Sequence, residues 1–294
     1  MDIQQRRRRD TRLTAPSPMQ LTDRDKDIIR AICDYRILRQ DQIQALFFGV
    51  NSGAKARAQK RLVKLFDHRY LTRFFLPTQG GMNSSPILYG LDKKGAELLR
   101  LEFGYDELHW YASMKELKDD FLEHTLAIAD VRVAVTVACQ REGYELLDWQ
   151  GENELKADYD HVNVRTSKGI SQSVPVVPDS YFVIATPMGK AHFFLELDRG
   201  TMTNSRFRTK VEAYVAYFQQ GYQHRYGTKS LRILTVTVGQ ARLANLKRIT
   251  EQVPETTWFW FGLLDDINAQ EVLSTPIWQV AGGESSQTLI ELTP

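Results

Sequence analysis

FFLELDRGT, residues 193–201, sets the organisation of the second half of this chain. It begins as an apolar run typical of a buried strand and ends in charged residues that include Glu196 and Asp198. Side chains alternate along a strand with a period of two, so these two carboxylates share one face. A buried strand that carries two acids where it leaves the core indicates a functional site or a strongly paired one.

A second apolar run precedes this strand, and a TPMGK segment with the composition of a turn joins the two. The run VPVVPDSYFVIA, residues 174–185, is therefore predicted to fold back antiparallel on the first strand. Folding about the centre of the turn places Asp179 opposite Leu197. We expect Asp179 to lie next to Glu196 and Asp198 at one end of a hairpin.

Three clustered carboxylates repel one another unless a cation or basic side chains neutralise them. Their hard oxygen atoms are ligands that Mg²⁺ or Mn²⁺ accept, with water completing the shell. Such a metal polarises a phosphodiester and helps to generate hydroxide for its hydrolysis. The alternative is that the carboxylates are strand-end residues paired with Arg199 and with basic residues of the next helix. The sequence leaves both interpretations open.

The composition indicates two domains with different roles. The chain has 294 residues, of which 43% are hydrophobic, enough for a sizeable core. Residues 1–100 hold 20 Lys+Arg against 10 Asp+Glu, a net charge of +10, whereas the remaining residues carry a net charge of −8. A basic front and an acidic rear predict a polyanion as the partner of the front.

The sequence predicts a cytoplasmic protein without a membrane partner. Its longest apolar runs are far short of the ~18 residues that a membrane span needs. The N-terminus is polar and rich in arginine, with no apolar core of a secretory signal. Cys33 and Cys139 lie in helical apolar patterns and are interpreted as thiols of a cytosolic protein.

The first hundred residues have the pattern of a basic arm and a small domain. Residues 1–20 are charged and aperiodic, which predicts a disordered arm. Over residues 21–102 three helical patterns precede two strand patterns, with the third helix predicted over 54–68 and the strands over 70–77 and 86–91. Three helices followed by a β-hairpin is the order of a winged helix, a helix-turn-helix variant.

The third predicted helix carries a continuous basic face, which predicts a DNA-binding surface. Arg57, Lys60, Arg61 and Lys64 are spaced by three and four, and Arg73 lies on the first strand of the predicted wing. A basic face alone is also typical of a solvated helix surface. The hairpin, the arm and the charge balance together favour double-stranded DNA as the partner, with RNA as a weaker alternative.

Residues 113–294 are predicted to form an α/β domain after a linker at 103–112. The pattern is α-β-β-β-α-β-α-β, which indicates a mixed sheet with helices on its faces. WFWF, residues 258–261, alternates as a strand and is most simply interpreted as core. The last thirty residues are predicted to extend one edge of the sheet.

Pro178-Asp179, followed across a hairpin by Glu196-Leu197-Asp198, resembles the core motif of PD-(D/E)xK nucleases. The resemblance implies a nuclease-like fold with Asp179 and Glu196 as metal ligands. Asp198 occupies the position of the motif lysine, which helps to activate the attacking water in that superfamily. Some members supply this lysine from the following helix, and here the resemblance makes Lys210 the candidate. Asp179, Glu196, Asp198 and Lys210 are thus the candidate catalytic residues.

Further motifs extend the resemblance over about residues 20 to 265. They are LTDRD (21–25), LFFG (46–49), YGL (89–91), HTLA (124–127), FLELDRGT (194–201), and Lys210 with Tyr214 and Tyr217. Together they resemble the replication-relaxation family of plasmids and other mobile elements. The resemblance implies a DNA-binding winged helix that acts in replication or transfer, with replication or conjugation proteins as expected partners.

Two functions from different classes follow from these patterns. The first is a DNA-binding factor whose nuclease-like domain cleaves DNA with Mg²⁺ or Mn²⁺. The second is a non-enzymatic regulator or accessory factor, whose degenerate nuclease-like domain serves dimerisation or partner docking. The aspartate in place of the motif lysine favours the second, and the sequence leaves open whether the protein is a homodimer.

Overall fold

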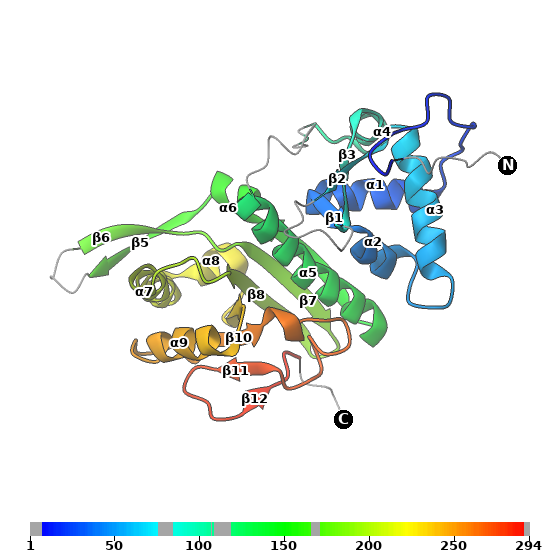
Figure 1. Cartoon of the computed structure of the whole chain (residues 1–294). Helices are drawn as coiled ribbons and strands as arrows, with labels where there is room; N and C mark the ends of the chain where they lie inside the picture. The colour runs from blue at the N-terminus through cyan, green and yellow to red at the C-terminus, as the bar shows by residue number, and fades with distance from the viewer. Residues whose placement is uncertain (1–7, 76–84, 107, 109–118, 166–170, 291–294) are drawn as a thin grey trace. The chain divides into compact units, whose positions relative to one another are not determined.

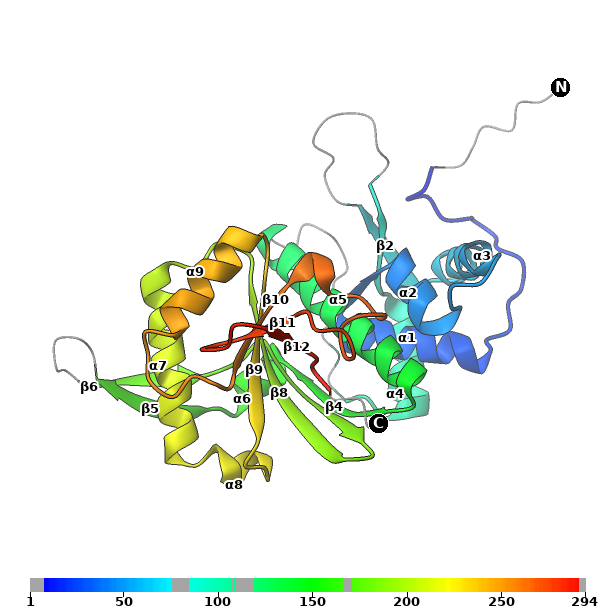
Figure 2. The same ribbon diagram turned by 90° about the horizontal axis from the view of Figure 1, so that it is seen from below.

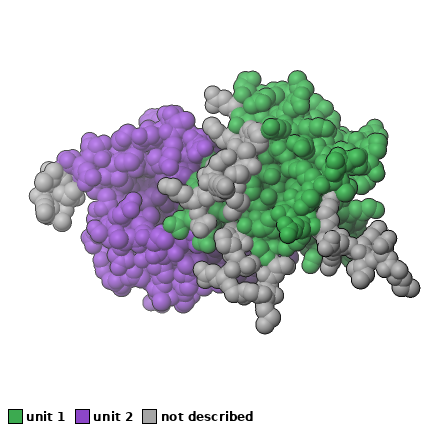
Figure 3. Space-filling model, turned by 45° about the horizontal axis from the view of Figure 1, so that its top comes forward, with its two compact units in different colours: residues 1–129 green, residues 130–294 purple. Residues whose placement is uncertain are grey.

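The structure, a computed structural model, describes residues 8–75, 85–106, 108, 119–165 and 171–290 (Figure 1). The chain divides into two compact units, residues 1–129 and 130–294, each of which is described by itself (Figure 3). No helix within the described ranges combines the length and the apolar character needed to cross a bilayer.

The first unit has the element order predicted for a winged helix. Its elements are α1 (Asp23–Tyr35), β1 (Ile37–Arg39), α2 (Gln40–Phe47), α3 (Ala54–Asp67), β2 (Leu71–Phe75), β3 (Ile87–Leu91) and α4 (Lys93–Phe103). The strands form an antiparallel sheet in the order β1-β3-β2. Strand β1 was not predicted from the sequence, because a three-residue strand is too short for a period-two pattern to show.

Amphipathic helices build the core of this unit. In α1, Ile28, Ile29 and Ile32 are fully buried, as their helical spacing predicts. On α3, the small side chain of Ala58 and the larger one of Leu62 face inward on the side opposite to the exposed basic residues. The buried stripe of α3 therefore fixes which side of this helix meets solvent.

The described part of the N-terminal arm is ordered, which corrects the disorder predicted for it. Within residues 8–20, the Leu13 backbone N–H donates a hydrogen bond to Asp67 Oδ1 at 3.1 Å. The Arg12 guanidinium forms an ion pair with Asp92 at 2.5 Å. The arm supplies donors to carboxylates at the ends of α3 and β3, a need that the composition of the arm alone does not reveal. The first seven residues lie outside the described part.

The second unit is the mixed α/β fold predicted from the sequence. Its elements are α5 (Asp119–Glu142, which begins in the first unit), β4 (Glu145–Gly151), α6 (Glu152–Ala157), β5 (Asp160–Arg165), β6 (Ser171–Val176), β7 (Ser180–Thr186), β8 (Gly189–Asp198), α7 (Asn204–Gln220), α8 (Tyr222–Tyr226), β9 (Leu231–Thr237), α9 (Gln240–Thr250), β10 (Phe259–Leu263), β11 (Trp278–Val280) and β12 (Ser286–Gln287). The main sheet has the order β12-β11-β10-β9-β8-β7-β4. Strands β4, β7 and β8 form an antiparallel meander, and β8, β9 and β10 run parallel. The last strands extend one edge, as predicted.

The run VPVVPDSYFVIA does not form one strand. It divides at Pro178-Asp179, so that β6 pairs with β5 in a separate two-stranded sheet while β7 joins the main sheet. Proline cannot donate to a sheet ladder, which explains the division at this point. The β5–β6 hairpin was not predicted, because its short polar strands lack a clear alternation.

The two faces of the main sheet are covered by different helices. Figure 2 shows α7 and α9 on one face and α5 on the other. Tyr181, Phe194, Ile233 and Phe259 belong to the core under α7 and α9. Because side chains alternate along a strand, Glu196, two residues after Phe194, points to this same face.

Several predicted features fall outside the described residues. These are half of the linker at 103–112, the start of the long helix predicted from Ser113, and the tip of the predicted wing between β2 and β3.

Candidate functional site

The β7–β8 hairpin brings Asp179 directly beside Glu196. The register pairs Ser180 with Leu195, so Asp179, the residue before β7, falls opposite Glu196. The predicted position, opposite Leu197, was wrong by one residue. The difference of one residue arises because the turn contains two residues and its centre lies half a residue earlier in the chain.

Two hydrogen bonds hold Asp179 at the end of this hairpin. Its backbone N–H donates to the Leu195 carbonyl oxygen at 3.0 Å. Its Oδ2 atom accepts a hydrogen bond from the Leu197 backbone N–H at 2.7 Å. These bonds extend the β7–β8 ladder by one residue and fix the carboxylate next to β8.

Helix α7 supplies two partners to Glu196. Lys210 Nζ forms an ion pair with Oε2, and the Tyr214 hydroxyl donates a hydrogen bond to Oε1. Residues four apart lie on the same helix face, which explains why both reach one carboxylate. Glu196 is only 6% exposed, whereas the Lys210 side chain is 28% exposed. Asp179, Glu196 and Lys210 therefore converge, as the relocated-lysine hypothesis requires.

The surroundings of Glu196 shift its pKa far from the ordinary value of 4.5. Burial raises the pKa of Glu196 to about 7, with a further increase from the charge of Asp179, while Lys210 and Tyr214 act in the opposite direction. Burial alone would lower the pKa of Lys210, but the charges of Glu196 and Asp179 outweigh it and raise this pKa. Near neutral pH, Glu196 is therefore poised between its two protonation states.

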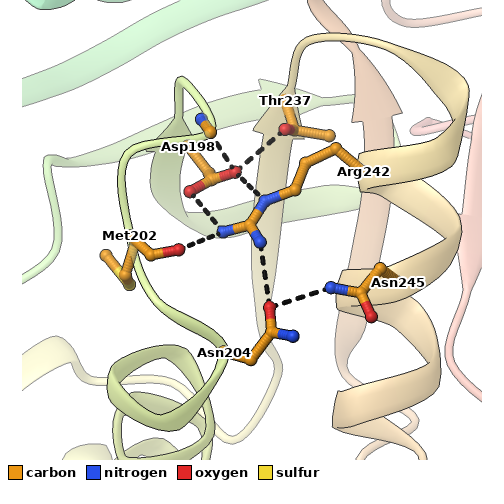
Figure 4. A network of polar contacts seen from close by, with 7 residues as sticks. Asp198, Met202, Asn204, Thr237, Arg242 and Asn245 are labelled. Atoms are coloured by element: carbon orange, nitrogen blue, oxygen red, sulfur yellow. Dashed lines mark hydrogen bonds and ion pairs between the residues drawn. The ribbon is translucent and has the colours of Figure 1, made fainter.

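Asp198, on the same face of β8, belongs to a different network (Figure 4). Arg242 Nε and Nη2 donate to its two oxygen atoms at 2.7 Å and 3.0 Å. The Thr237 hydroxyl and the Gly200 backbone N–H donate to Oδ2 at 3.1 Å and 3.2 Å. Burial opposes ionisation of Asp198, but these hydrogen bonds, led by that from Arg242, outweigh it and lower the pKa of Asp198.

Arg242 also ties α9 to the loop that follows β8. Its Nη2 donates to the Met202 carbonyl oxygen at 2.6 Å, and its Nη1 donates to Asn204 Oδ1 at 3.0 Å (Figure 4). Asn245 donates to the same Asn204 oxygen at 2.9 Å. Arg242 was not among the residues predicted from the sequence, although its place in the first turn of the helix after β9 puts it at the end of a strand parallel to β8.

The predicted carboxylate cluster thus divides into two groups. Asp179 and Glu196 lie with Lys210, whereas Asp198 is bound by Arg242. Within the part of the chain that the structure describes, no group of three or more His, Cys, Asp or Glu side chains has an arrangement that could hold a metal ion. A cation at this site would depend on two protein carboxylates.

Asp179 and Glu196 fit Mg²⁺ or Mn²⁺ in the kind of donor they offer. Mg²⁺ is commonly held by one or two carboxylates, with water and substrate phosphate completing its shell. The Leu197 backbone N–H donates to Oδ2 of Asp179 at this end of the hairpin. Glu196 would have to exchange a contact with Lys210 or Tyr214 for the cation, since each holds one of its oxygen atoms.

The basic surface predicted in the first unit lies along α3. Arg57, Lys60 and Lys64 are exposed. They border a groove of about 300 Å³ whose floor includes the ring of Phe48, over which the Arg24 guanidinium lies at 5.2 Å. This groove presents cations beside a short aromatic surface.

All three arginines predicted to contact DNA have partners within the first unit. Arg57 is exposed and donates to Asn51 Oδ1 at 2.5 Å and to the Ser52 carbonyl oxygen at 3.4 Å. Arg61 forms an ion pair with Asp25, whose side chain is fully buried in α1. The guanidinium of Arg73 lies over the Phe66 ring at 4.3 Å and over the Tyr89 ring at 5.4 Å. Arg61 therefore neutralises a buried charge and Arg73 packs within the unit, which leaves Arg57, Lys60 and Lys64 as the exposed part of the predicted set.

The family model described as replication-relaxation matches residues 29–231, more than half of the chain. The chain belongs to the replication-relaxation family. The match spans α3 and its basic face, the β7–β8 hairpin and the whole of α7, so it includes both candidate sites of this replication-relaxation protein except the part of the groove formed by Thr22, Arg24 and Asp25. Among curated proteins, no sequence matches the chain.

Two solved structures of the restriction endonuclease FokI are similar to this replication-relaxation protein, one of them bound to DNA. They share 11% and 12% identity with it, cover 83% and 85% of the chain, and have TM-scores of 0.26 and 0.25. The chain spans 42% and 45% of their lengths, less than half. The fold assignment rests on the sheet topology described above.

Proposed function

We propose that this protein binds duplex DNA in the replication or relaxation of a plasmid or other mobile element, and that its second unit hydrolyses a phosphodiester bond of that DNA. The observation that supports hydrolysis is the convergence of Asp179, Glu196 and Lys210 at the end of the β7–β8 hairpin. Family membership supports the link to replication.

Each residue of this site has a distinct role in the proposal. Asp179 and Glu196 are the ligands of Mg²⁺ or Mn²⁺, which, when bound, neutralises phosphate charge and makes a water molecule more acidic. Lys210 keeps its proton and favours the ionised form of Glu196. If Glu196 held the cation, the Lys210 ammonium would be available to contact a phosphate oxygen or to orient the attacking water. Tyr214 holds the other oxygen of Glu196 and limits its rotation.

The proposal assigns DNA binding to α3 of the first unit. Arg57, Lys60 and Lys64 are exposed on one side of this helix, and cations spaced in this way suit the phosphates that flank a major groove. Each phosphate contact that is lost should reduce the slope of log K against log salt by about 0.9.

A cleavage assay tests the enzymatic part. Supercoiled plasmid is incubated with the protein and Mg²⁺, Mn²⁺ or a chelator, and the nicked and linear forms are measured. We expect nicking with either cation, and its loss in Asp179→Ala and Lys210→Met. Glu212→Gln, which changes a half-buried side chain of α7 that pairs with Arg208, is the matched control and should cleave like wild type. Equal activity of the Asp179→Ala variant would contradict the proposal.

A binding assay tests the DNA-binding part independently. Arg57→Glu combined with Lys60→Glu should weaken duplex binding strongly at physiological salt, because two phosphate contacts become repulsive. Lys94→Glu reverses an exposed charge on α4 and serves as the control. Unchanged affinity in the α3 variant would place the binding surface elsewhere.

A non-enzymatic accessory factor is the second candidate, and one observation favours it. Both oxygen atoms of Glu196 are already occupied by Lys210 and Tyr214, as in a site that stabilises the fold. Under this alternative, titration calorimetry detects no binding of Mg²⁺ or Mn²⁺. Asp179→Ala and Glu196→Ala would then lower the unfolding temperature and leave DNA binding unchanged.

A further inference from the structure

A cavity lined by aromatic and basic side chains lies at the opposite end of the main sheet from the candidate site. It has a volume of about 390 Å³ and lies where β9 and β10 begin. Its principal lining residues are Phe218, Gln223, Lys229, Arg232, Trp258 and Trp260. Residues 231 to 237 of β9 separate it from the Asp198 network, a distance of roughly 20 Å along an extended strand.

Phe218 and Tyr222 of this cavity are buried, whereas its two tryptophans are only partly buried. The strand pattern WFWF predicted a core, and Phe259 and Phe261 are indeed buried at 1% and 0% exposure. Trp258 and Trp260, by contrast, are half-buried and line the cavity. The two indoles therefore form a partly exposed aromatic surface, while the phenylalanines that alternate with them are buried in the core.

Stacking already orders these rings. The Trp258 ring lies on the Phe218 ring with their centroids 4.1 Å apart and an interplanar angle of 16°. The Arg232 guanidinium lies over the Trp260 ring at 4.7 Å, and its Nη1 is held by the Leu289 carbonyl oxygen at 2.6 Å. Rings and a guanidinium fixed in this way lose little conformational entropy when a further planar group stacks on them.

The charged and polar groups of the cavity indicate what this planar group is. The charged side chains that line it, Lys229 and Arg232, are cations, and no carboxylate is among its described lining residues. Gln223 and Thr257 add exposed donors and acceptors at the rim. Aromatic faces beside cations and a few hydrogen-bonding groups are the features of a site for single-stranded nucleic acid.

We propose that this cavity binds a nucleotide of single-stranded DNA, with the base extending the Phe218–Trp258 stack and the adjoining phosphate near Lys229. The site is separate from the carboxylates of the proposed hydrolysis and would remain if that reaction were disproved. It differs from a docking site for a protein segment in that its lining is cationic rather than mainly apolar.

Titration with a fluorescein-labelled oligothymidylate of twelve nucleotides tests this site. The full chain is used with Arg57→Glu and Lys60→Glu in place, so that the exposed cations of the first unit contribute little. Anisotropy should show saturable binding, and tryptophan emission should be quenched in parallel. Trp258→Ala should weaken binding about tenfold, because the stack is lost. Lys229→Glu should weaken binding by a similar factor without disturbing the fold. The Lys229 side chain is exposed, and the hydrogen bond from the Tyr222 hydroxyl goes to the backbone oxygen of Lys229, which the substitution keeps.

A control separates this proposal from its alternatives. Arg248→Glu, which reverses an exposed charge on α9, should bind the oligonucleotide like its parent. Wild-type binding in Lys229→Glu, or saturation without any quenching of tryptophan emission, would overturn the proposal. Equal affinity for a twelve-base-pair duplex would also overturn it, because that result would indicate a general electrostatic surface. Binding of neither nucleic acid, with capture of a peptide instead, would assign the cavity to a protein partner.

Discussion

The pair formed by Asp198 and Arg242 allows the sharpest prediction about this fold. Asp198 is 5% exposed, and its partner side chain is 18% exposed. Replacing Arg242 with alanine removes two of the four hydrogen bonds described for this carboxylate and leaves its charge buried. Breaking a buried ion pair from one side costs roughly 3–5 kcal/mol. Because Arg242 keeps some exposure, we expect the lower end, about 3 kcal/mol.

Thermal unfolding followed by tryptophan emission measures this loss. For a unit of this size, about 3 kcal/mol corresponds to a decrease of roughly 6–12 °C in the unfolding temperature. Arg208→Ala is the matched control, because Arg208 pairs with Glu212 on the exposed side of α7 and such a pair contributes about 0–1 kcal/mol. Adding Asp198→Ala to Arg242→Ala should restore part of the stability, since no charge is then left unpaired.

The same pair has a defined dependence on pH. The pKa of Asp198 is lowered in the folded protein, so its contribution is present above the ordinary value of 3.8 and is lost as the pH falls through the lowered pKa. The difference in stability between wild type and Arg242→Ala should therefore shrink in acid. If Arg242→Ala were no less stable than Arg208→Ala at neutral pH, the reasoning about this network would be wrong.

Three further predictions concern the other charged groups. Arg61→Ala should lower the free energy of unfolding of the first unit by about 3 kcal/mol, because it leaves the buried carboxylate of Asp25 without its cation. Lys60→Glu, at an exposed position, should change this free energy by less than about 0.5 kcal/mol. Chemical denaturation of the two variants measures the difference. The pKa of Glu196 is raised from its ordinary value of 4.5 to about 7, so this carboxyl group stabilises the fold fully below pH 4.5 and loses that contribution as the pH rises through about 7. The unfolding free energy of Glu196→Gln should not show this decline with pH. Divalent-cation affinity measured by calorimetry should rise with pH through about 7, because Glu196 must be ionised to bind the cation. Tyr214→Phe should move this rise to higher pH, because it removes a hydrogen bond that lowers the pKa of Glu196. An unchanged midpoint in Tyr214→Phe would count against Glu196 as the ligand that titrates.

Periodicity was sufficient to predict most of the architecture. The helical spacing of Ile28, Ile29 and Ile32 located α1, and the apolar runs located β8, β9 and β10. Helix α1 buries one apolar face, whereas β8 and β9 are buried on both faces over consecutive residues and appear as apolar runs, so the residue types predict the burial directly. Short elements such as β1, and the β5–β6 hairpin with its polar strands, carry no comparable pattern.

The candidate site could be predicted only in part, because pairwise contacts depend on register and on distant residues. Counting about the turn brought Asp179 to within one residue of its partner, and helical spacing brought Lys210 to the same face. That Asp198 is bound by Arg242, and that Arg61 is bound by Asp25, depends on contacts across 44 and 36 residues of sequence. No local pattern distinguishes a cation committed to such a partner from one that faces solvent.

The Asp198–Arg242 pair also limits how this protein can change over evolutionary time. A lysine introduced at position 198 alone would lie against the guanidinium of Arg242, which Met202 and Asn204 hold in place. Loss of Arg242 alone would leave an unpaired carboxylate inside the fold. A lysine at position 198 of β8 therefore requires two simultaneous substitutions, whereas Lys210 already reaches Glu196 from α7.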